Sequence, residues 1–501
     1  MTNTTTKPPL AADAADSQLL IGGGPAPAAT GEQFERYSPA HDVLVARYAK
    51  AGPEDVDRAV SAAQKAFTDG PWPHRSGAAR AKVLTAVGAL IQRDRQELAR
   101  LETLESGKPI SQALDEVDGA AELWLYAATL ARHAYGDAHN HLGDDVLALV
   151  LNEPVGVVAV ITPWNFPLLI LSQKLPFALA VGCTAVVKPS ELTPGTTVHL
   201  GRLLDEAGLD PGVVNILTGH GDVGAAMTGH PGVEMVSFTG STRVGRQVAA
   251  TAGAQLKRVE LELGGKNPQI VCADADLEAA LDAVAFGVYF NAGECCNSGS
   301  RVLVDARIAE SFQERLVALS RTVPMGDPLE VSTKVGAITS DEQLASIERY
   351  VAEGQSEGFE LLLGGRRRPT DAGKFYEPTI FADVAPTASI AREEIFGPVL
   401  TVIPFRNLEE AIAIANSTMY GLSAGIWTSD LNAALSSARR LQAGTVWVNR
   451  WMDGYPELPF GGYKASGEGR ELGRQAVSSF TQTKTIQLQV GPRTTRWLPR
   501  P

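Results

Sequence analysis

Residues 155–162, Val-Gly-Val-Val-Ala-Val-Ile-Thr, mark the place where the pattern of this sequence changes. Upstream of them, apolar residues recur at helical spacing through residues 53–70, 76–107 and 111–134. Downstream, short runs of β-branched residues alternate with helical patterns, which is typical of a parallel sheet covered by helices. The expected strands of this sheet are 155–162, 185–188, 213–217 and 235–239. The sequence therefore predicts an α/β fold.

A second α/β series follows the first. Its expected strands are 270–272, 301–304 and 399–405, and its expected helices are 276–289, 308–319 and 408–416. Two stretches, 146–152 and 483–490, resemble isolated strands, which need partners because an unpaired strand leaves its backbone groups free. A single core stops growing at ~250–300 residues, so we expect two or more domains.

The composition excludes several classes of protein. A formal net charge of −13, with basic residues spread along the chain, argues against nucleic acid or an anionic membrane as partner. No apolar run approaches the ~20 residues of a membrane span. The 4 cysteines are too few for a disulfide framework and have no metal-ligand spacing, so we expect a cytoplasmic protein without a metal. Residues 1–20 lack the pattern of a secretory signal, and we interpret them as a disordered lead-in.

The segment of residues 258–301 contains a carboxylate near its start and a thiol near its end. The segment contains Glu262-Leu-Gly-Gly-Lys266 and ends in Asn291-Ala-Gly-Glu-Cys-Cys-Asn-Ser-Gly-Ser-Arg301. A cysteine nucleophile forms a covalent adduct, and a glutamate that takes a proton from water can hydrolyse it. The alternative is that Cys295 and Cys296 are small buried apolar residues, which is common for isolated cysteines.

Polar residues follow several expected strands, where the ligands of an open α/β sheet bind. Asn165 has an amide that can donate hydrogen bonds to an oxyanion. Lys188 and Glu191 can bind a vicinal diol, with the carboxylate disfavouring a 2′-phosphate, although a solvated charge pair is the alternative. Gly240 and Ser241 start a helix and suit either an anion site or an ordinary glycine turn with a helix cap.

Residues 219–224 match the dinucleotide pattern G-x-G-x-x-G and follow an expected strand. The pattern also requires an acidic residue ~20 positions further on, at the end of the next strand. That strand ends in Thr239-Gly240-Ser241, so we reject the standard fingerprint here.

Seven motifs in register resemble those of the aldehyde dehydrogenase superfamily, and the resemblance extends from about Ser17 to Val490. The motifs are Pro163-Trp-Asn-Phe-Pro167, Lys188-Pro-Ser-Glu191, Phe238-Thr-Gly-Ser241 with Gly245, Glu262-Leu-Gly-Gly-Lys266, Gly293-Glu-Cys-Cys296, Glu393-Glu-Ile-Phe-Gly-Pro398 and Pro459-Phe-Gly-Gly462.

The resemblance implies a Rossmann-like cofactor domain, an α/β catalytic domain and a small β oligomerisation arm. These would comprise residues 21–133 and 154–261, residues 262–480, and residues 134–153 and 481–501, respectively. The terminal strand would then find its partner in another subunit of a homo-oligomer, either a dimer or a dimer of dimers.

The resemblance also implies hydrolytic oxidation of an aldehyde to the carboxylic acid. Cys296 matches the nucleophile, Asn165 the oxyanion donor, Glu262 the general base and Glu471 a proton relay. A coenzyme A-acylating enzyme and a non-catalytic structural member of the family are the alternatives. The retained Glu262 and Cys296 argue against them.

The cofactor implied by the resemblance is NAD rather than NADP because Glu191 is present. The residues that match cofactor contacts of the family are Ile161, Pro163, Trp164, Lys188, Ser190, Glu191, Gly221, Phe238, Gly240, Ser241, Val244, Leu263, Glu394 and Phe396.

The aldehyde substrate is the small-molecule partner, and the resemblance places its tunnel. The expected lining residues are Tyr126, Ile170, Gln173, Cys295, Asn297, Asp453, Tyr455, Glu457 and Phe460. Carboxylates near the tunnel mouth favour a cationic amino aldehyde or betaine aldehyde. Gln173 and Phe460 stand where the betaine-aldehyde members usually have Trp, so the cage is incomplete, and broad specificity for non-acidic aldehydes is the other expectation.

Overall fold

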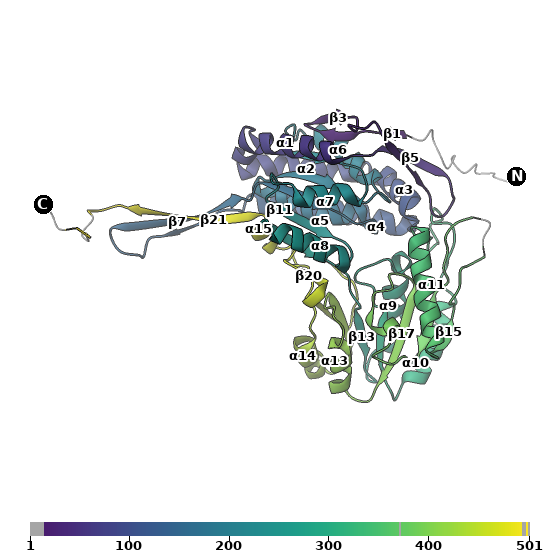
Figure 1. The fold of residues 1–501 in the computed structure, drawn as a ribbon. Helices are drawn as coiled ribbons and strands as arrows, with labels where there is room; N and C mark the ends of the chain where they lie inside the picture. Colours follow the sequence, from purple (N-terminus) through teal and green to yellow (C-terminus); the bar gives the residue numbers. More distant parts are fainter. Residues whose placement is uncertain (1–14, 370–371, 493–496, 499–501) are drawn as a thin grey trace.

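The protein is described here by a computed structural model covering residues 15–369, 372–492 and 497–498. Figure 1 shows two α/β bodies, one above the other, and a long two-stranded ribbon that projects to one side. The expected α/β fold is confirmed. None of the helices in the part of the chain that the structure describes is long and apolar enough to cross a membrane.

The first body is built on an eight-stranded sheet with the order β20-β12-β11-β8-β9-β10-β2-β3. Its parallel strands are β8 (Val157–Ile161), β9 (Thr184–Lys188), β10 (Val214–Ile216), β11 (Met235–Thr239) and β12 (Arg258–Glu262). Its edges add the antiparallel strands β2 (Leu19–Ile21), β3 (Gly24–Ala26) and β20 (Gly467–Glu468). The chain runs outward from β8 through β9 and β10, then returns to β11 on the other side. Ligands of such sheets bind where the strand order reverses, at the carboxyl ends of β8 and β11.

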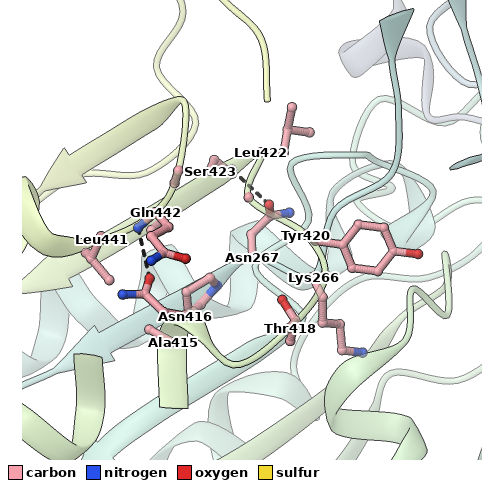
Figure 2. Close-up of a pocket in the computed structure, with 14 residues that line it drawn as sticks. Lys266, Asn267, Ala415, Asn416, Thr418, Tyr420, Leu422, Ser423, Leu441 and Gln442 are labelled. Carbon is pink, nitrogen blue, oxygen red and sulfur yellow. Dashed lines mark hydrogen bonds between the residues drawn. The ribbon is translucent and has the colours of Figure 1, made fainter. Parts of the chain in front are cut away.

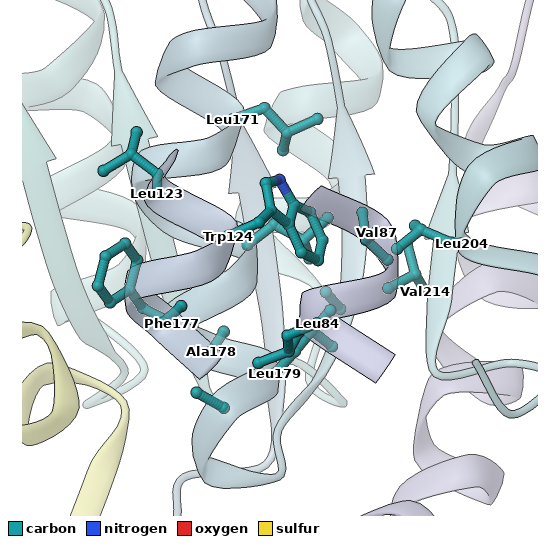
Figure 3. Close-up of a cluster of buried hydrophobic side chains, with 14 of the residues drawn as sticks. Leu84, Val87, Leu123, Trp124, Leu171, Phe177, Ala178, Leu179, Leu204 and Val214 are labelled. Carbon is teal, nitrogen blue, oxygen red and sulfur yellow. The ribbon is translucent and has the colours of Figure 1, made fainter. Parts of the chain in front are cut away.

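Helices cover both faces of this sheet. They are α1 (Pro53–Thr68), α2 (Gly77–Arg93), α3 (Arg95–Ser106), α4 (Ile110–Ala131), α5 (Pro167–Val181), α6 (Gly195–Glu206), α7 (Gly221–Gly229) and α8 (Thr242–Gly253), with the short 3₁₀ helix η1 (Trp72–His74). Figure 3 shows Trp124 among buried side chains of α2, α4, α5, α6 and β10. The indole Nε1 of Trp124 donates to Ser172 Oγ over 3.0 Å, so the ring is buried with its polar atom satisfied.

The single helical block expected over residues 76–107 is two helices, α2 and α3, that meet at Asp94. Asp94 accepts hydrogen bonds from Arg93 Nε over 2.7 Å and from His199 Nε2 over 2.8 Å. Aspartate favours such local hydrogen bonds over helix interior positions, which explains the break.

The second body has a seven-stranded sheet with the order β15-β16-β17-β14-β13-β18-β19. The strands are β13 (Pro268–Val271), β14 (Arg301–Asp305), β15 (Glu360–Leu363), β16 (Thr379–Ala382), β17 (Val399–Phe405), β18 (Ser423–Trp427) and β19 (Thr445–Val448). Its helices are α9 (Leu277–Tyr289), α10 (Ala309–Ser320), α11 (Asp341–Ser356), α12 (Ser389–Arg392), α13 (Leu408–Asn416) and α14 (Leu431–Arg440), with the 3₁₀ helices η2 (Phe290–Gly293) and η3 (Lys464–Ser466).

Two small sheets complete the fold. One contains β1 (Ala15–Ser17), β5 (Leu44–Ala49) and β4 (Gln33–Tyr37). The other contains β6 (Asp137–His139), β7 (Val146–Pro154) and β21 (Thr481–Gln489), and its two long strands form the ribbon in Figure 1. β21 follows the short helix α15 (Gln475–Ser479) and pairs antiparallel with β7 from Thr481 opposite Pro154 to Gln489 opposite Val146.

Two expectations need correction. The terminal strand has its partner in this chain, because β7 and β21 pair with each other. The lead-in expected over residues 1–20 ends earlier, since β1 and β2 occupy residues 15–17 and 19–21; residues 1–14 lie outside the described part. Leu19 is buried, so this edge strand adds apolar cover to the sheet.

Candidate active site

The loop that carries Cys296 has an unusual backbone. After α9, residues Asn291, Ala292 and Gly293 all have positive φ values of 49°, 55° and 76°. A side chain on Gly293 would approach the carbonyl oxygen of Gly397 to 2.1 Å, so only glycine fits there. Such a conformation costs free energy and persists where neighbouring contacts fix it, which is common at functional sites.

Asn165 lies against this loop, as expected for an oxyanion donor. Its Nδ2 donates to the carbonyl oxygen of Glu294 over 3.1 Å, and its own carbonyl oxygen accepts from Asn291 Nδ2 over 3.2 Å. Asn291 Nδ2 also donates to the Glu294 carbonyl over 3.1 Å. The amide of Asn165 has two hydrogens, so one remains for a ligand beside Cys296.

The segment after β12 packs directly onto Cys296. Asn267 Nδ2 donates to the carbonyl oxygens of Cys296, over 2.7 Å, and of Ser298, over 2.9 Å. A side chain on Gly265 would meet the Cys296 carbonyl at 2.6 Å. Figure 2 shows the other side of Asn267, where its Oδ1 accepts from Ser423 N over 3.1 Å beside a small pocket. None of the expected tunnel residues lines that pocket.

Glu262 ends β12 and is 4% exposed. Neither of its carboxylate oxygens has a hydrogen-bond partner among the described residues. Burial, followed by the nearby charge of Glu471, raises the pKa of Glu262 well above its usual value. Burial therefore favours the protonated form of Glu262, which becomes a base when it loses that proton.

Cys296 is half-buried, and its neighbour Cys295 is buried. A hydrogen bond with Cys295, followed by burial, raises the pKa of the Cys296 thiol well above its usual value, and the charges of Glu394 and Glu262 act in the same direction. The nucleophile is thus a thiol in the free protein and needs a proton acceptor before it can attack. Glu394 and Glu262 are the carboxyl groups whose charges act on this thiol, and of the two only Glu262 has both oxygens without a hydrogen-bond partner among the described residues.

Glu471 is buried and forms an ion pair with Lys174, which is also fully buried. Lys174 was not among the expected site residues. The signal was present, because a single cation in the otherwise apolar helix α5 needs a buried partner. Asn267 and Asn291 were also missed, and no motif in the sequence distinguishes them from other loop residues.

The expected cofactor residues gather at the carboxyl ends of β8, β9, β11 and β12. Ser241 caps α8 by accepting a hydrogen bond from Val244 N over 3.3 Å. Lys188 Nζ lies 3.7 Å from a Glu191 carboxylate oxygen, and burial lowers the pKa of Lys188. The others here are Ile161, Pro163 and Trp164 after or at the end of β8, Ser190 after β9, Phe238 and Gly240 around the end of β11, and Leu263 after β12.

This crevice fits a dinucleotide. The N-terminus of α8 offers free backbone N–H groups to a pyrophosphate, and a side chain on Gly245 would meet Leu263 Cδ2 at 2.4 Å. Gly221 begins α7 after β10, and two strands, β8 and β9, lie between β10 and β11 in the sheet. The rejected G-x-G-x-x-G pattern therefore lies away from the point where the strand order reverses.

Glu394 and Phe396 reach the crevice from the second body. Glu394 Oε1 accepts from Gly265 N over 3.1 Å, and burial raises the pKa of Glu394 to about 7. Phe396, with a φ of 58°, packs edge-to-face on Trp164 with ring centroids 5.3 Å apart. These contacts join the two bodies between the cofactor crevice and Cys296.

An apolar cluster lies beside the nucleophile. It consists of the buried Phe166, Ile170 and Cys295, with Leu169, Phe290 and Met452 packed against them. The rings of Phe166 and Phe290 are stacked with centroids 5.9 Å apart. The structure thus brings together two expected tunnel residues, Ile170 and Cys295, while Tyr126 and Phe460 pack with Leu169 against the adjacent core. Gln173 and Asn297 are half-buried.

The carboxylate that was expected to attract a cation is not free. Asp453 forms an ion pair with Arg450, whose Nη2 also donates to Tyr455 Oη over 3.0 Å. The sequence argument counted Asp453 and Tyr455 without this neighbouring cation. Glu457 is exposed. Burial of Tyr126 raises the pKa of that tyrosine, and the charge of Glu457 raises it further.

The fold is that of the aldehyde dehydrogenase family, and this chain belongs to it: the family model matches residues 26–486. Among curated relatives, the chain is 43% identical to retinaldehyde dehydrogenase 3 of Homo sapiens, over 92% of this chain and 91% of the relative. It is 40% identical to betaine aldehyde dehydrogenase of Bacillus subtilis (strain 168), over 96% and 99%.

Solved structures agree with this assignment. The crystal structure of an NAD-dependent aldehyde dehydrogenase from Sinorhizobium meliloti has a TM-score of 0.95 and 50% identity, and covers 97% of each chain. A betaine aldehyde dehydrogenase from Staphylococcus aureus, in complex with NAD+, has a TM-score of 0.94 and 36% identity, and covers 97% of each chain.

Proposed function

We propose that this protein oxidises an aldehyde to the free carboxylic acid with NAD, through a thioester on Cys296. The observation that carries the proposal is Glu262, a buried carboxyl group with both oxygens unpaired, beside the loop that presents Cys296. A general base for hydrolysis must be close to the adduct and free to take a proton from water.

The residues of this chain support each step. Cys296 gives its proton to the ionised form of Glu262, which passes it to solvent, and the thiolate attacks the aldehyde carbon. The oxyanion of the resulting thiohemiacetal is stabilised by the Asn165 amide and by the backbone N–H of Cys296. When NAD is bound, it accepts a hydride from the thiohemiacetal carbon, and a thioester remains on Cys296. Glu262 then takes a proton from a water molecule, which attacks the thioester carbon and releases the acid and the Cys296 thiolate.

The cofactor assignment rests on the crevice. Glu191 is half-exposed beside Lys188, so it can bind the two hydroxyls of an adenosine ribose and would repel a 2′-phosphate. Two further observations support NAD: the structures of relatives in complex with NAD+, and the position of Ser241 at the N-terminus of α8, where backbone N–H groups can bind a pyrophosphate. One relative is named as NADP/NAD-dependent, so NADP serves as the comparison cofactor in the assay below.

The apolar cluster and the Arg450–Asp453 pair favour uncharged aldehydes. A cationic substrate gains little from Asp453 while Arg450 neutralises it, and an anionic one meets Glu457. The apolar side chains Phe166, Ile170 and Met452 stabilise a hydrocarbon chain by removing it from water.

We expect NADH and free acid to form from neutral aldehydes without coenzyme A, with kcat/KM at least about tenfold above that for betaine aldehyde or succinate semialdehyde. Spectrophotometry of NADH and chromatography of the acid measure this. Arg450→Gln frees Asp453 and should shift the preference toward the cationic aldehyde, whereas Arg439→Gln, on the distant helix α14, should not. If product forms only when coenzyme A is present, the acylating alternative would be favoured. If no aldehyde gives NADH, the non-catalytic alternative would be favoured.

The β7–β21 ribbon supports a homo-oligomer. Its residues after Thr481 are mostly exposed, including Leu488 and Val490, and a long exposed strand pair is unusual in a monomer. We expect light scattering to give the mass of a dimer or a dimer of dimers, and a monomer would contradict this.

The free thiols of all 4 cysteines favour a reducing compartment such as the cytoplasm.

A further inference from the structure

Strand β12 carries a second buried carboxyl group, Glu260, for which the proposed reaction has no role so far. Glu260 and Glu262 are two residues apart, so their side chains point to the same face of the sheet. Glu260 is 1% exposed. A buried carboxyl group costs free energy unless its neighbours compensate, so its contacts are informative.

A series of contacts joins Glu260 to the active site. Ser237, which faces Glu260 from β11, donates from its hydroxyl to Glu260 Oε2 over 3.4 Å. Lys174 Nζ donates to Ser237 Oγ over 3.1 Å, and the same ammonium forms the buried ion pair with Glu471. Glu471 in turn is the charged neighbour that contributes most to the raised pKa of Glu262. Printed contacts therefore connect Glu471, Lys174, Ser237 and Glu260, and Glu262 lies within the electrostatic influence of Glu471 without a direct hydrogen bond to it.

The outer end of this path lies close to solvent. Gly469 is exposed, with a φ of 94°, and a side chain there would come within 3.1 Å of Glu260 Cγ and 3.6 Å of its Oε1. Oε1 has no hydrogen-bond partner among the described residues. The half-buried Ser479 hydroxyl also reaches Glu260. The exposed Gly469, which has no side chain, therefore lies between the Glu260 carboxyl group and solvent.

The charges along the path suit proton exchange near neutral pH. Three buried carboxyl groups share one buried ammonium, Lys174. Burial, followed by the charge of Glu471, raises the pKa of Glu260 to about 8, while Lys174, Ser479 and Ser237 oppose this shift. Glu260 thus holds a proton at neutral pH and releases it as the pH rises through this value.

We propose that Glu260 and Ser237 carry to solvent, at the Gly469 turn, the proton that Glu262 takes from the hydrolytic water. This inference rests on the proposed hydrolytic function. Glu262 passes the proton through a bridging water molecule to Glu471, which gives a proton to Lys174. As it receives that proton, Lys174 donates one to the Ser237 hydroxyl, which gives its own to Glu260, and Glu260 releases one to water. Every group returns to its starting state.

Glu260→Gln keeps the shape of the side chain and removes its titration. In the holoenzyme, we expect a normal first burst of NADH and a roughly tenfold lower kcat with KM unchanged. The rise of the deacylation rate near pH 8 should disappear, and imidazole at high concentration should restore the rate. Ser237→Ala interrupts the same path without removing a charge and should give the same burst, kcat loss and rescue.

Glu234→Gln is the matched control. Glu234 is an exposed residue next to the amino end of β11, and its carboxylate accepts a hydrogen bond from Val157 N over 2.8 Å. Its replacement should leave kcat and the imidazole response unchanged. Wild-type turnover in both Glu260→Gln and Ser237→Ala, or loss of the burst in both, would overturn the proton path alone. A wild-type protein that releases no acid would overturn the proposed function as well.

Discussion

Replacing Cys296 by serine is expected to reduce aldehyde oxidation by roughly 10³-fold or more, because the reaction loses its nucleophile. A hydroxyl is a weaker acid than a thiol, and even the Cys296 thiol has its pKa raised by the Cys295 contact and by burial. Serine is close to cysteine in size, so Asn267 should still hold the loop through the carbonyl of residue 296. Steady-state NADH formation measures the loss, and unchanged NAD binding shows that the crevice is intact.

Cys295→Ser tests which of the adjacent thiols reacts. Cys295 packs in the apolar cluster with Phe166 and Ile170, so its replacement should alter substrate affinity while turnover stays within about tenfold. Cys295→Ala removes the hydrogen bond that raises the pKa of Cys296, so iodoacetamide should modify Cys296 in that variant at a lower pH than in the wild type. Full turnover in Cys296→Ser, with inactivity in Cys295→Ser, would reverse the assignment.

The sequence predicts correctly those strands and helices whose pattern depends only on their own residues. The β-branched run at 157–161 and the apolar spacing of α1 are recognisable without knowledge of their neighbours. In contrast, β20 has two residues, and it exists because Leu261 and Glu262 offer backbone groups to Glu468 and Gly467. No periodicity can predict a strand of that length.

Contacts between distant residues account for most of what was missed in the site. Lys174 and Glu471 are 297 positions apart, so the ion pair becomes visible only in the fold. The Arg450–Asp453 pair is different, because a three-residue separation is readable in the sequence. The Arg450–Asp453 ion pair weakens the charge argument for a cationic substrate, because that argument treats Asp453 as a free carboxylate.

Glu262→Gln should separate the two halves of the reaction. We expect one equivalent of NADH per active site at a rate near that of the wild type, followed by a steady rate that is roughly 10²–10⁴-fold lower. Cys296 and Asn165 remain in place, so the thioester forms, but no buried base then accepts a proton from water. Intact-mass measurement should show the acyl group on the protein, and hydroxylamine, a nucleophile that needs no base, should release it.

The pH dependence distinguishes the loss of a base from the loss of the fold. Glu262 has a pKa raised by burial and by Glu471, so its protonated form favours the folded state at low pH, and that contribution is lost as the pH rises through the folded pKa. Glutamine cannot titrate. The melting temperature of Glu262→Gln should therefore fall less than that of the wild type between neutral and alkaline pH, while its slow deacylation loses the wild-type rise over the same range. A variant that melts earlier throughout and shows no burst would mean that Glu262 supports the fold, and would remove it from the reaction.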